Sequence, residues 1–309
     1  PDEIIVSEVI TDLSCFEDGT GAIDISITGG IAPYVLSWLN GETTSYIDEL
    51  DANTYTLSLT DANLCPYIES FIVEEPDLLE ATYVETHVDC FGNSTGEVSI
   101  TVSGGTSPFN YAWSNLTSNE DLFNIPTGAY DVMITDAHNC KDSASVNINE
   151  PTEIIFTVNS IDLICNNEFE GEILIAGSGG TPGYSYSIDG EGTYSNGSDF
   201  LNLQAGNYSV WIQDAKGCKK NQTVVLNQPI GFSTIVDIQN IEGCNGDATG
   251  IIDFSINGNT SPYTYKWTTV PEEHTSSIYN LSSGNYEVEV TDANSCEMTY
   301  SYFVSEPEA

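Results

Sequence analysis

The strongest constraint on this chain is an internal repeat, which its eight cysteines make visible. Each copy has a first and a second cysteine, and the pairs are Cys15 and Cys65, Cys90 and Cys140, Cys165 and Cys218, and Cys244 and Cys296. The two cysteines of a copy are 50, 50, 53 and 52 residues apart, and the second cysteines recur every 75, 78 and 78 residues. Because a fixed period is the signature of a repeat architecture, the sequence predicts four domains, followed by the start of another copy. Their ranges are 1–75, 76–150, 151–228, 229–306 and 307–309.

Further signals recur in the same order in every copy. Each copy shows C-x5-G, an alternating apolar run, a glycine break, an aromatic run that follows a proline, a segment like L-x-x-G-x-Y, T-D-A-x-x-C and a closing E-P. The third copy departs at three positions, where Ile188 replaces a Trp, Gln213 replaces a Thr and Gln228 replaces a Glu. These departures weaken any assignment of chemistry to those three positions.

The hydrophobic period is that of β-strands. Tyr34, Leu36 and Trp38 alternate with more polar neighbours, and Gly, Asn, Asp and Pro bound the run. A period of two with aromatic and β-branched residues is typical of half-buried antiparallel strands. We therefore predict an all-β chain of four tandem immunoglobulin-like β-sandwiches, each with six or seven short strands. The Tyr that closes L-x-x-G-x-Y stands where such sandwiches place a tyrosine corner.

The near-constant spacing of the cysteines predicts one disulfide within each copy. A sandwich of about 75 residues has a small core, so a covalent link is expected in an exported chain. Closing a loop of about 50 residues contributes roughly 4 kcal/mol on the chain-entropy model. The first cysteine follows strand one and the second precedes the last strand. In a simple up-and-down order they share one end with six strands and lie at opposite ends with seven, unless one strand changes sheet. Such bonds imply an oxidising compartment.

The charge of the chain excludes several classes of partner. Asp and Glu number 47 against five basic residues, which gives a net charge of −42. Such a chain repels phosphates, so nucleic acid and anionic lipid surfaces are excluded as partners. No apolar run reaches the ~18 residues of a transmembrane helix. Every copy is acidic, at −15, −10, −6 and −10, and this repulsion together with stiff Glu-Pro joints favours an extended monomeric rod of about 150 Å.

Both ends of the sequence coincide with a repeat joint. Pro1 takes the position of Pro76, and residues 307–309 open what would be a fifth copy. We therefore expect a segment of a longer array, whose secretion and anchoring modules lie elsewhere.

The ordered set of motifs resembles the SprB repeat family of large bacterial surface adhesins. The resemblance covers all four copies and rests on C-x5-G, GG-x-x-P-Y, the Trp, L-x-x-G-x-Y, T-D-A-x-x-C and E-P. It implies a secreted, surface-exposed protein of Bacteroidetes bacteria, of the kind that gliding machinery moves along the cell. It also implies that an external surface or polysaccharide is contacted through the full-length adhesin.

Residues with catalytic chemistry do not form a repeated set. His87, His138 and His274 stand at non-equivalent positions. With every cysteine paired, no thiol nucleophile remains, and abundant carboxylates follow from composition alone. We therefore expect no enzyme activity.

Four aspartates recur before the second cysteine, and they have two interpretations. One is an Asx-type turn, in which the carboxylate accepts backbone N–H bonds. The other is calcium, which prefers six to eight oxygen ligands. No D-x-D-x-D-G loop occurs, so no cofactor is required and calcium stays an option at these positions. The residues are Asp61, Asp136, Asp214 and Asp292.

Two functions follow from these observations. The first is a structural stalk segment of a gliding-type adhesin, in which neighbouring repeats of the chain contact one another. The second is a saccharide-binding array with one site per repeat. Buried tryptophans and bare acidic faces favour the stalk, whereas a ladder of exposed aromatics on one face favours the array.

Overall fold

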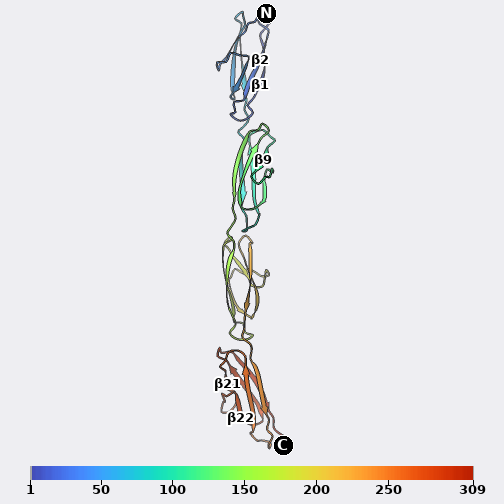
Figure 1. The fold of residues 1–309 in the computed structure, drawn as a ribbon, viewed down its shortest axis with the longest axis vertical. Helices are drawn as coiled ribbons and strands as arrows, with labels where there is room; N and C mark the ends of the chain where they lie inside the picture. Colours follow the sequence, from blue (N-terminus) through green and yellow to red (C-terminus); the bar gives the residue numbers. More distant parts are fainter. Residues whose placement is uncertain (1, 309) are drawn as a thin grey trace. The chain divides into compact units, whose positions relative to one another are not determined.

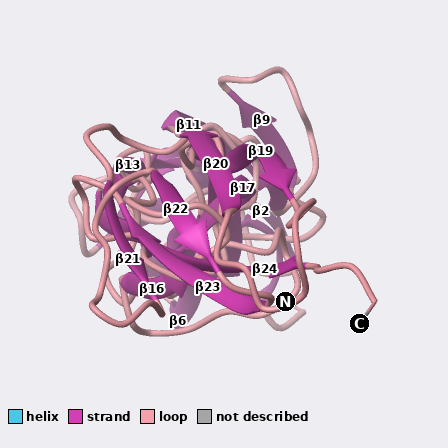
Figure 2. Ribbon diagram, turned by 90° about the horizontal axis from the view of Figure 1, so that it is seen from below, coloured by secondary structure: helices cyan, strands magenta, loops and turns pink. Residues whose placement is uncertain are grey.

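The computed structural model describes residues 2–308, so Pro1 and Ala309, which belong to the predicted first domain and to the start of a following copy, lie outside it. The described residues form strands and loops, with no helix among them (Figures 1 and 2). Each copy contains six strands, which decides between six and seven. In the first copy they are β1 (Ile5–Thr11), β2 (Gly21–Thr28), β3 (Val35–Trp38), β4 (Tyr46–Leu50), β5 (Asn53–Thr60) and β6 (Pro66–Val73).

The other three copies repeat this order. The second copy has β7 (Glu80–Thr86), β8 (Gly96–Ser103), β9 (Asn110–Trp113), β10 (Leu122–Ile125), β11 (Gly128–Thr135) and β12 (Lys141–Ile148). The third has β13 (Ile155–Ile161), β14 (Gly171–Ser178), β15 (Ser185–Ser187), β16 (Asp199–Leu203), β17 (Gly206–Gln213) and β18 (Lys219–Leu226). The fourth has β19 (Ser233–Gln239), β20 (Gly250–Asn257), β21 (Thr264–Trp267), β22 (Ser277–Leu281), β23 (Gly284–Thr291) and β24 (Glu297–Val304).

Every copy is a sandwich of two three-stranded antiparallel sheets. In the first copy the sheets have the orders β1-β2-β4 and β3-β5-β6, and the same two orders recur in the other copies. The buried side chains form four hydrophobic clusters, one inside each copy. These observations confirm the predicted fold class of four immunoglobulin-like sandwiches.

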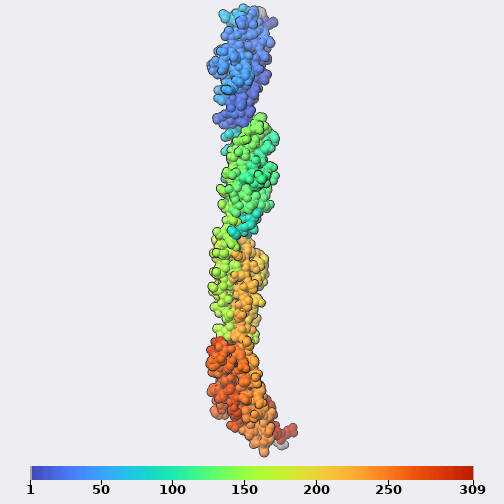
Figure 3. All heavy atoms as spheres, viewed as in Figure 1, coloured from blue at the N-terminus to red at the C-terminus, as the bar shows by residue number. Residues whose placement is uncertain are grey.

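The chain also divides into two compact units, Pro1–Pro151 and Thr152–Ala309, which hold two copies each. The exact borders of the four copies stay predictions. Figure 3 shows the atoms of each copy as a filled body, and the described end of the chain leaves the body of the fourth copy.

The core explains two of the repeated motifs. The tryptophans at the end of β3, β9 and β21 are buried, and each indole N–H donates to a backbone carbonyl in the following loop. The tyrosine of L-x-x-G-x-Y donates its hydroxyl to the carbonyl four residues earlier in all four copies, with distances of 2.8–3.0 Å. This is the predicted tyrosine corner. Its members are Tyr55, Tyr130, Tyr208 and Tyr286.

The glycine of C-x5-G begins the second strand of each copy, where there is no room for a side chain. A Cβ on Gly21 would lie 2.7 Å from both the Leu50 carbonyl oxygen and Val73 Cγ1. A contact this short would force the β4 backbone in the same sheet and the Val73 side chain of the facing sheet to shift. The motif is therefore a packing requirement at the end of the sandwich that carries the first cysteine.

Strands β3 and β4 belong to different sheets but together make a single crossing of the sandwich. Strand β2 is antiparallel to both β1 and β4, and β5 is antiparallel to both β3 and β6. The end of β1 meets the end of β6, because the Leu13 N–H donates to the Glu74 carbonyl. Strands β3 and β4 consequently run the same way, and six strands make only five crossings.

This topology places the two cysteines of a copy at opposite ends of the sandwich. Cys15 follows β1, at the end where β6 finishes, whereas Cys65 lies between β5 and β6, at the end where β1 starts. The predicted bonds Cys15–Cys65, Cys90–Cys140, Cys165–Cys218 and Cys244–Cys296 are therefore wrong. The structure instead contains Cys15–Cys140 and Cys165–Cys296, Cys90 and Cys218 are also disulfide-bonded, and Cys65 and Cys244 are free and exposed.

Candidate functional site

The Cys15–Cys140 and Cys165–Cys296 disulfides each join two consecutive copies. Each bond lies where the loop that carries the first cysteine of one copy meets the loop that carries the second cysteine of the next. Cys15 in the β1–β2 loop bonds Cys140 in the β11–β12 loop, with Cα atoms 5.7 Å apart. Cys165 bonds Cys296 in the same way, with Cα atoms 5.6 Å apart. The carbonyl before each first cysteine lies beside the partner sulfur, at 3.3 Å for Ser14 and 3.6 Å for Ile164. One junction geometry is thus used in both units.

The first-cysteine loop is shaped by its own hydrogen bonds. In the first copy, Asp18 Oδ2 accepts the Cys15 N–H at 2.8 Å, and Asp18 Oδ1 accepts from Thr20. Burial acts to raise the pKa of Asp18, but the hydrogen bonds from Thr20 and Cys15 together outweigh it and the net pKa is lowered. The carboxylate therefore stays ionised and holds the loop in a tight turn.

The Glu or Gln that precedes the proline at the end of each copy also holds this loop. The side-chain oxygen accepts a backbone N–H from the second residue after the first cysteine, at 2.7–2.9 Å in every copy. An amide oxygen accepts as a carboxylate does, so the Gln of the third copy keeps the contact. The acceptors are Glu75, Glu150, Gln228 and Glu306. The sequence places these residues at the joint between copies, and their recurrence about 60 residues after the first cysteine of every copy is the signal that points to this contact.

The recurring aspartates shape the second-cysteine loop. In each copy one carboxylate oxygen accepts two N–H groups, from the residue two positions on and from the second cysteine, at 2.8–2.9 Å. The other oxygen accepts an N–H from the glycine-break loop at 2.8–3.1 Å. All four carboxylates are buried. They are Asp61, Asp136, Asp214 and Asp292, and their geometry is that of the Asx-type turn.

The electrostatics of two of these groups follow from the same contacts. The Cys65 N–H is the main cause of the lowered pKa of Asp61. Burial acts to raise the pKa of Asp136, but the N–H groups of Thr106, Cys140 and His138 outweigh it and the net pKa is lowered. Both carboxylates therefore stabilise the fold above the ordinary carboxyl pKa, and this contribution is lost as the pH falls through the lowered value.

The aspartate geometry does not favour calcium. Three N–H donors already occupy each carboxylate, and a cation would compete with them for the same oxygens. Within residues 2–308, no group of three or more His, Cys, Asp or Glu side chains is arranged to hold a metal ion. Calcium at Asp61, Asp136, Asp214 and Asp292 stays a hypothesis for experiment.

We expect millimolar calcium to shift the melting temperature no more than equimolar magnesium does. Any divalent ion screens a chain of net charge −42, whereas a specific site would stabilise the native state beyond that effect. Thermal unfolding at fixed ionic strength measures both. A calcium-specific rise that disappears in Asp292→Asn would instead establish a calcium site at that turn.

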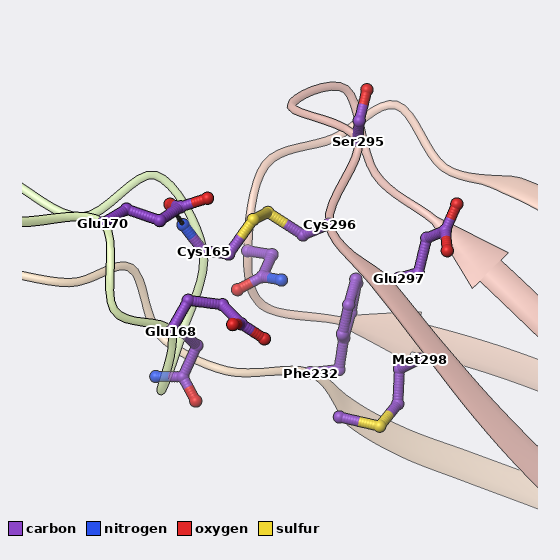
Figure 4. A pocket seen from close by; sticks show the side chains of 10 residues that line it. Cys165, Glu168, Glu170, Phe232, Ser295, Cys296, Glu297 and Met298 are labelled. Atoms are coloured by element: carbon purple, nitrogen blue, oxygen red, sulfur yellow. Dashed lines mark hydrogen bonds between the residues drawn. A yellow bond between two sulfur atoms is a disulfide. The ribbon is translucent and has the colours of Figure 1, made fainter. Parts of the chain in front are cut away.

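The junction of the second unit encloses a hollow of about 310 Å³. Figure 4 shows the Cys165–Cys296 bond at its edge, with Glu168 and Glu170 on one wall and Phe232 and Met298 on the other. Cys296 is only 4% exposed. Three carboxylates line the hollow, counting Glu297, so both of its walls carry negative charge. A covalent bond therefore holds together two surfaces that repel each other.

Aromatic side chains do not form a ladder with one member per repeat. Trp38, Trp113 and Trp267 are at most 4% exposed, so none of them offers a ring to a sugar. The best exposed aromatic position, in the fourth strand of a copy, holds Phe123 and Tyr279 in two copies. Asp48 and Leu201 stand there in the other two. Repeated saccharide sites would need the same ring in each copy.

The histidines do not come together either. His138 Nδ1 lies 3.2 Å from the Ser14 carbonyl at the first junction, His87 contacts Asn149, and His274 contacts the Tyr265 carbonyl. Each has a separate structural contact. No helix among the described residues is long and apolar enough to cross a membrane.

Comparison with known proteins agrees with the prediction of four sequence repeats. The SprB repeat family model matches residues 7–43, 82–118, 157–193 and 237–271, one match in each copy. No curated protein sequence matches the chain.

In all, 137 chains of solved structures match, and they include immunoglobulin domains. A chain described under Dscam isoform specificity is 12% identical, with 98% of this chain and 99% of that chain covered and a TM-score of 0.28. The eight N-terminal Ig domains of DSCAM are 9% identical, with 98% and 60% covered and a TM-score of 0.34. Likenesses at such TM-scores carry no argument about function.

Proposed function

Because this chain is built from SprB repeats, we propose that it is a structural stalk segment of a bacterial cell-surface adhesin. The adhesin is of the gliding-motility type and belongs to a Bacteroidetes bacterium. In this proposal the segment carries no ligand site of its own. It holds other parts of the protein away from the cell, and these contact an external surface or a polysaccharide.

The observation that supports this proposal best is the covalent bond between consecutive copies. Each copy begins at one end of its sandwich and finishes at the other, so tension along the chain passes through every copy. The Cys15–Cys140 and Cys165–Cys296 bonds provide a second path for that tension, which bypasses the hydrogen bonds of the sheets. Such a device suits a chain that is pulled from its ends.

The proposed location is outside the cell. Disulfides persist in oxidising compartments and are reduced in most cytosols. Six of the eight cysteines are disulfide-bonded. The abundance of carboxylates keeps an exposed array soluble and opposes lateral packing of its copies.

We expect small-angle scattering of the oxidised chain to give a radius of gyration well above the ~19 Å of a compact 309-residue particle. The physical reason is that each copy has its two ends on opposite sides and the same sign of charge as its neighbours. The measurement is made at physiological salt and repeated after reduction. A value near the compact one would contradict the stalk and favour a binding site composed from several copies.

Saccharide binding remains the alternative from a different class. The buried tryptophans and the missing aromatic ladder give it no support. Binding of a polysaccharide panel to the intact chain would test it directly, with Phe123→Ala and Tyr279→Ala as the variants that remove the most exposed rings.

A further inference from the structure

Three positions give the Cys165–Cys296 junction free acceptor groups that the Cys15–Cys140 junction lacks. The first position directly follows the second cysteine. Lys141 stands there beside Cys140, whereas Glu297 stands there beside Cys296. The side-chain charge next to the disulfide is therefore positive at the first junction and negative at the second.

The second position lies in the loop of the first cysteine. At the first junction two side chains hold this loop, because Thr20 accepts the Ser14 N–H at 3.0 Å and Asp18 accepts the Cys15 N–H at 2.8 Å. In the third copy Glu170 Oε2 accepts both equivalent N–H groups, each at 3.2 Å. One carboxylate therefore does the work of two side chains.

This exchange releases Glu168, which stands at the position of Asp18. Within residues 2–308, Glu168 has no hydrogen bond and no ion pair. Figure 4 shows its side chain extending from the loop toward Phe232 on the opposite wall. The third copy thus offers a carboxylate that its own fold does not use.

The third position is the second residue of the glycine break. Gly30, Gly105 and Gly180 stand there in three copies with φ of 58–62°, and Asn259 stands there in the fourth with φ of 43°. Asn is one of the few side chains that adopt this left-handed conformation. Its Oδ1 is buried and has no hydrogen-bond partner among the described residues. A buried acceptor without a donor is costly, and a donor brought by a ligand would remove that cost.

All three acceptor residues line the hollow of about 310 Å³ beside the disulfide, and Phe232 and Met298 give it an apolar wall (Figure 4). No Lys or His side chain of the described residues lines it, so it repels anions. A bare metal ion does not fit it either, because no three His, Cys, Asp or Glu side chains in the described part of the chain are arranged to hold one. Carboxylates beside an aromatic ring suit an organic cation, since the face of the ring also attracts positive charge.

We propose that this hollow binds a primary ammonium group on an aliphatic chain, as found in a lysine side chain of another protein or in a free diamine. An ammonium has three N–H donors, and Glu168, Glu297 and Asn259 Oδ1 accept them. The aliphatic chain packs against Phe232 and Met298. Binding neutralises two walls that repel each other and so stabilises the junction. The stalk function does not depend on this site, since adhesion belongs to other parts of the protein.

The two methionines of the chain provide a binding test with an internal control. Met298 lines the hollow, whereas Met133 is 43% exposed on β11 of the second copy. The oxidised full-length chain, labelled with carbon-13 at its methionine methyl groups, is titrated with 1,5-diaminopentane and separately with capped lysine at fixed ionic strength. The Met298 signal should shift to saturation and the Met133 signal should stay in place. Binding of both amines supports the shared chemistry, and binding of only one identifies which source the site takes.

Neutral probes of the same shape separate charge from apolar contact. 1,5-Pentanediol and capped norleucine should give no saturable shift of Met298, because they lack the ammonium. Shifts equal to those of the amines would show an apolar pocket and overturn the proposal. Displacement of the diamine by calcium but not by magnesium would identify a metal site and would also overturn it.

Three variants test the residues. Glu297→Lys introduces the residue type that Lys141 provides at the first junction, so the fold should tolerate it and amine binding should be lost. Glu168→Gln should weaken binding roughly fivefold, the upper end of what an exposed ion pair contributes. Glu85→Gln removes the same charge from an exposed position on β7 and should keep the parent affinity. Equal weakening by Glu85→Gln and Glu168→Gln would show that binding follows net charge alone, and the absence of a saturable Met298 shift in the parent chain would equally overturn the proposal.

Discussion

Reduction of the disulfides should lengthen the stretched chain about sixfold. The two bonds enclose segments of 125 and 131 residues. In the oxidised chain only about one sixth of the residues can be extended at ~3.3–3.6 Å each, because tension crosses the bonds instead of the enclosed segments. After full reduction the whole chain extends. Force spectroscopy with handles at both ends, with and without reductant, measures the two contour lengths.

Bonds within copies would give a different oxidised length. They would enclose only about 50 residues each and leave about one third of the chain extensible, twice the value expected here. Non-reducing peptide mapping gives an independent check of the same connectivity. Cross-linked peptides containing Cys15 with Cys140 and Cys165 with Cys296 are expected, together with alkylated Cys65 and Cys244.

Trp267→Ala should destabilise the fourth sandwich by about 3–5 kcal/mol. Trp267 is 1% exposed, its indole N–H donates to the Thr275 carbonyl at 2.9 Å, and its ring lies 6.0 Å from that of Phe254. Truncation leaves a cavity in a small core and an unpaired carbonyl. Since single domains are stable by only about 5–15 kcal/mol, much of the stability of this copy would be lost. Denaturant titration followed by circular dichroism measures it.

The matched control is Tyr279→Ala in the same copy. Tyr279 is 61% exposed, so its loss should change the unfolding free energy by less than about 0.5 kcal/mol. If Trp267→Ala also changed the unfolding free energy by less than about 0.5 kcal/mol, Trp267 would not be a core residue. In that case the tryptophan would again be a candidate for ligand contact.

Local patterns predicted the sandwich because they are set by neighbouring residues. The alternation around Trp38 and Leu36 follows from the two faces of a strand. The Tyr of L-x-x-G-x-Y bonds a carbonyl only four residues away, and Asp61 bonds N–H groups of its own turn. Each of these contacts lies mostly within one short segment. Their recurrence in four copies made the prediction stronger than any single motif.

The sequence by itself determined the number of strand-rich repeats, the buried tryptophans, the tyrosine corner, the Asx-type turns and the acidity of the chain. Only the tertiary structure decided which cysteines meet. Constant spacing within a copy is the same whether a bond closes inside that copy or between copies, so spacing carries no information about the partner. The direction of each crossing decides it. Because β3 and β4 run the same way in different sheets, Cys15 and Cys65 lie at opposite ends of the sandwich, and Cys15 bonds Cys140 of the following copy instead.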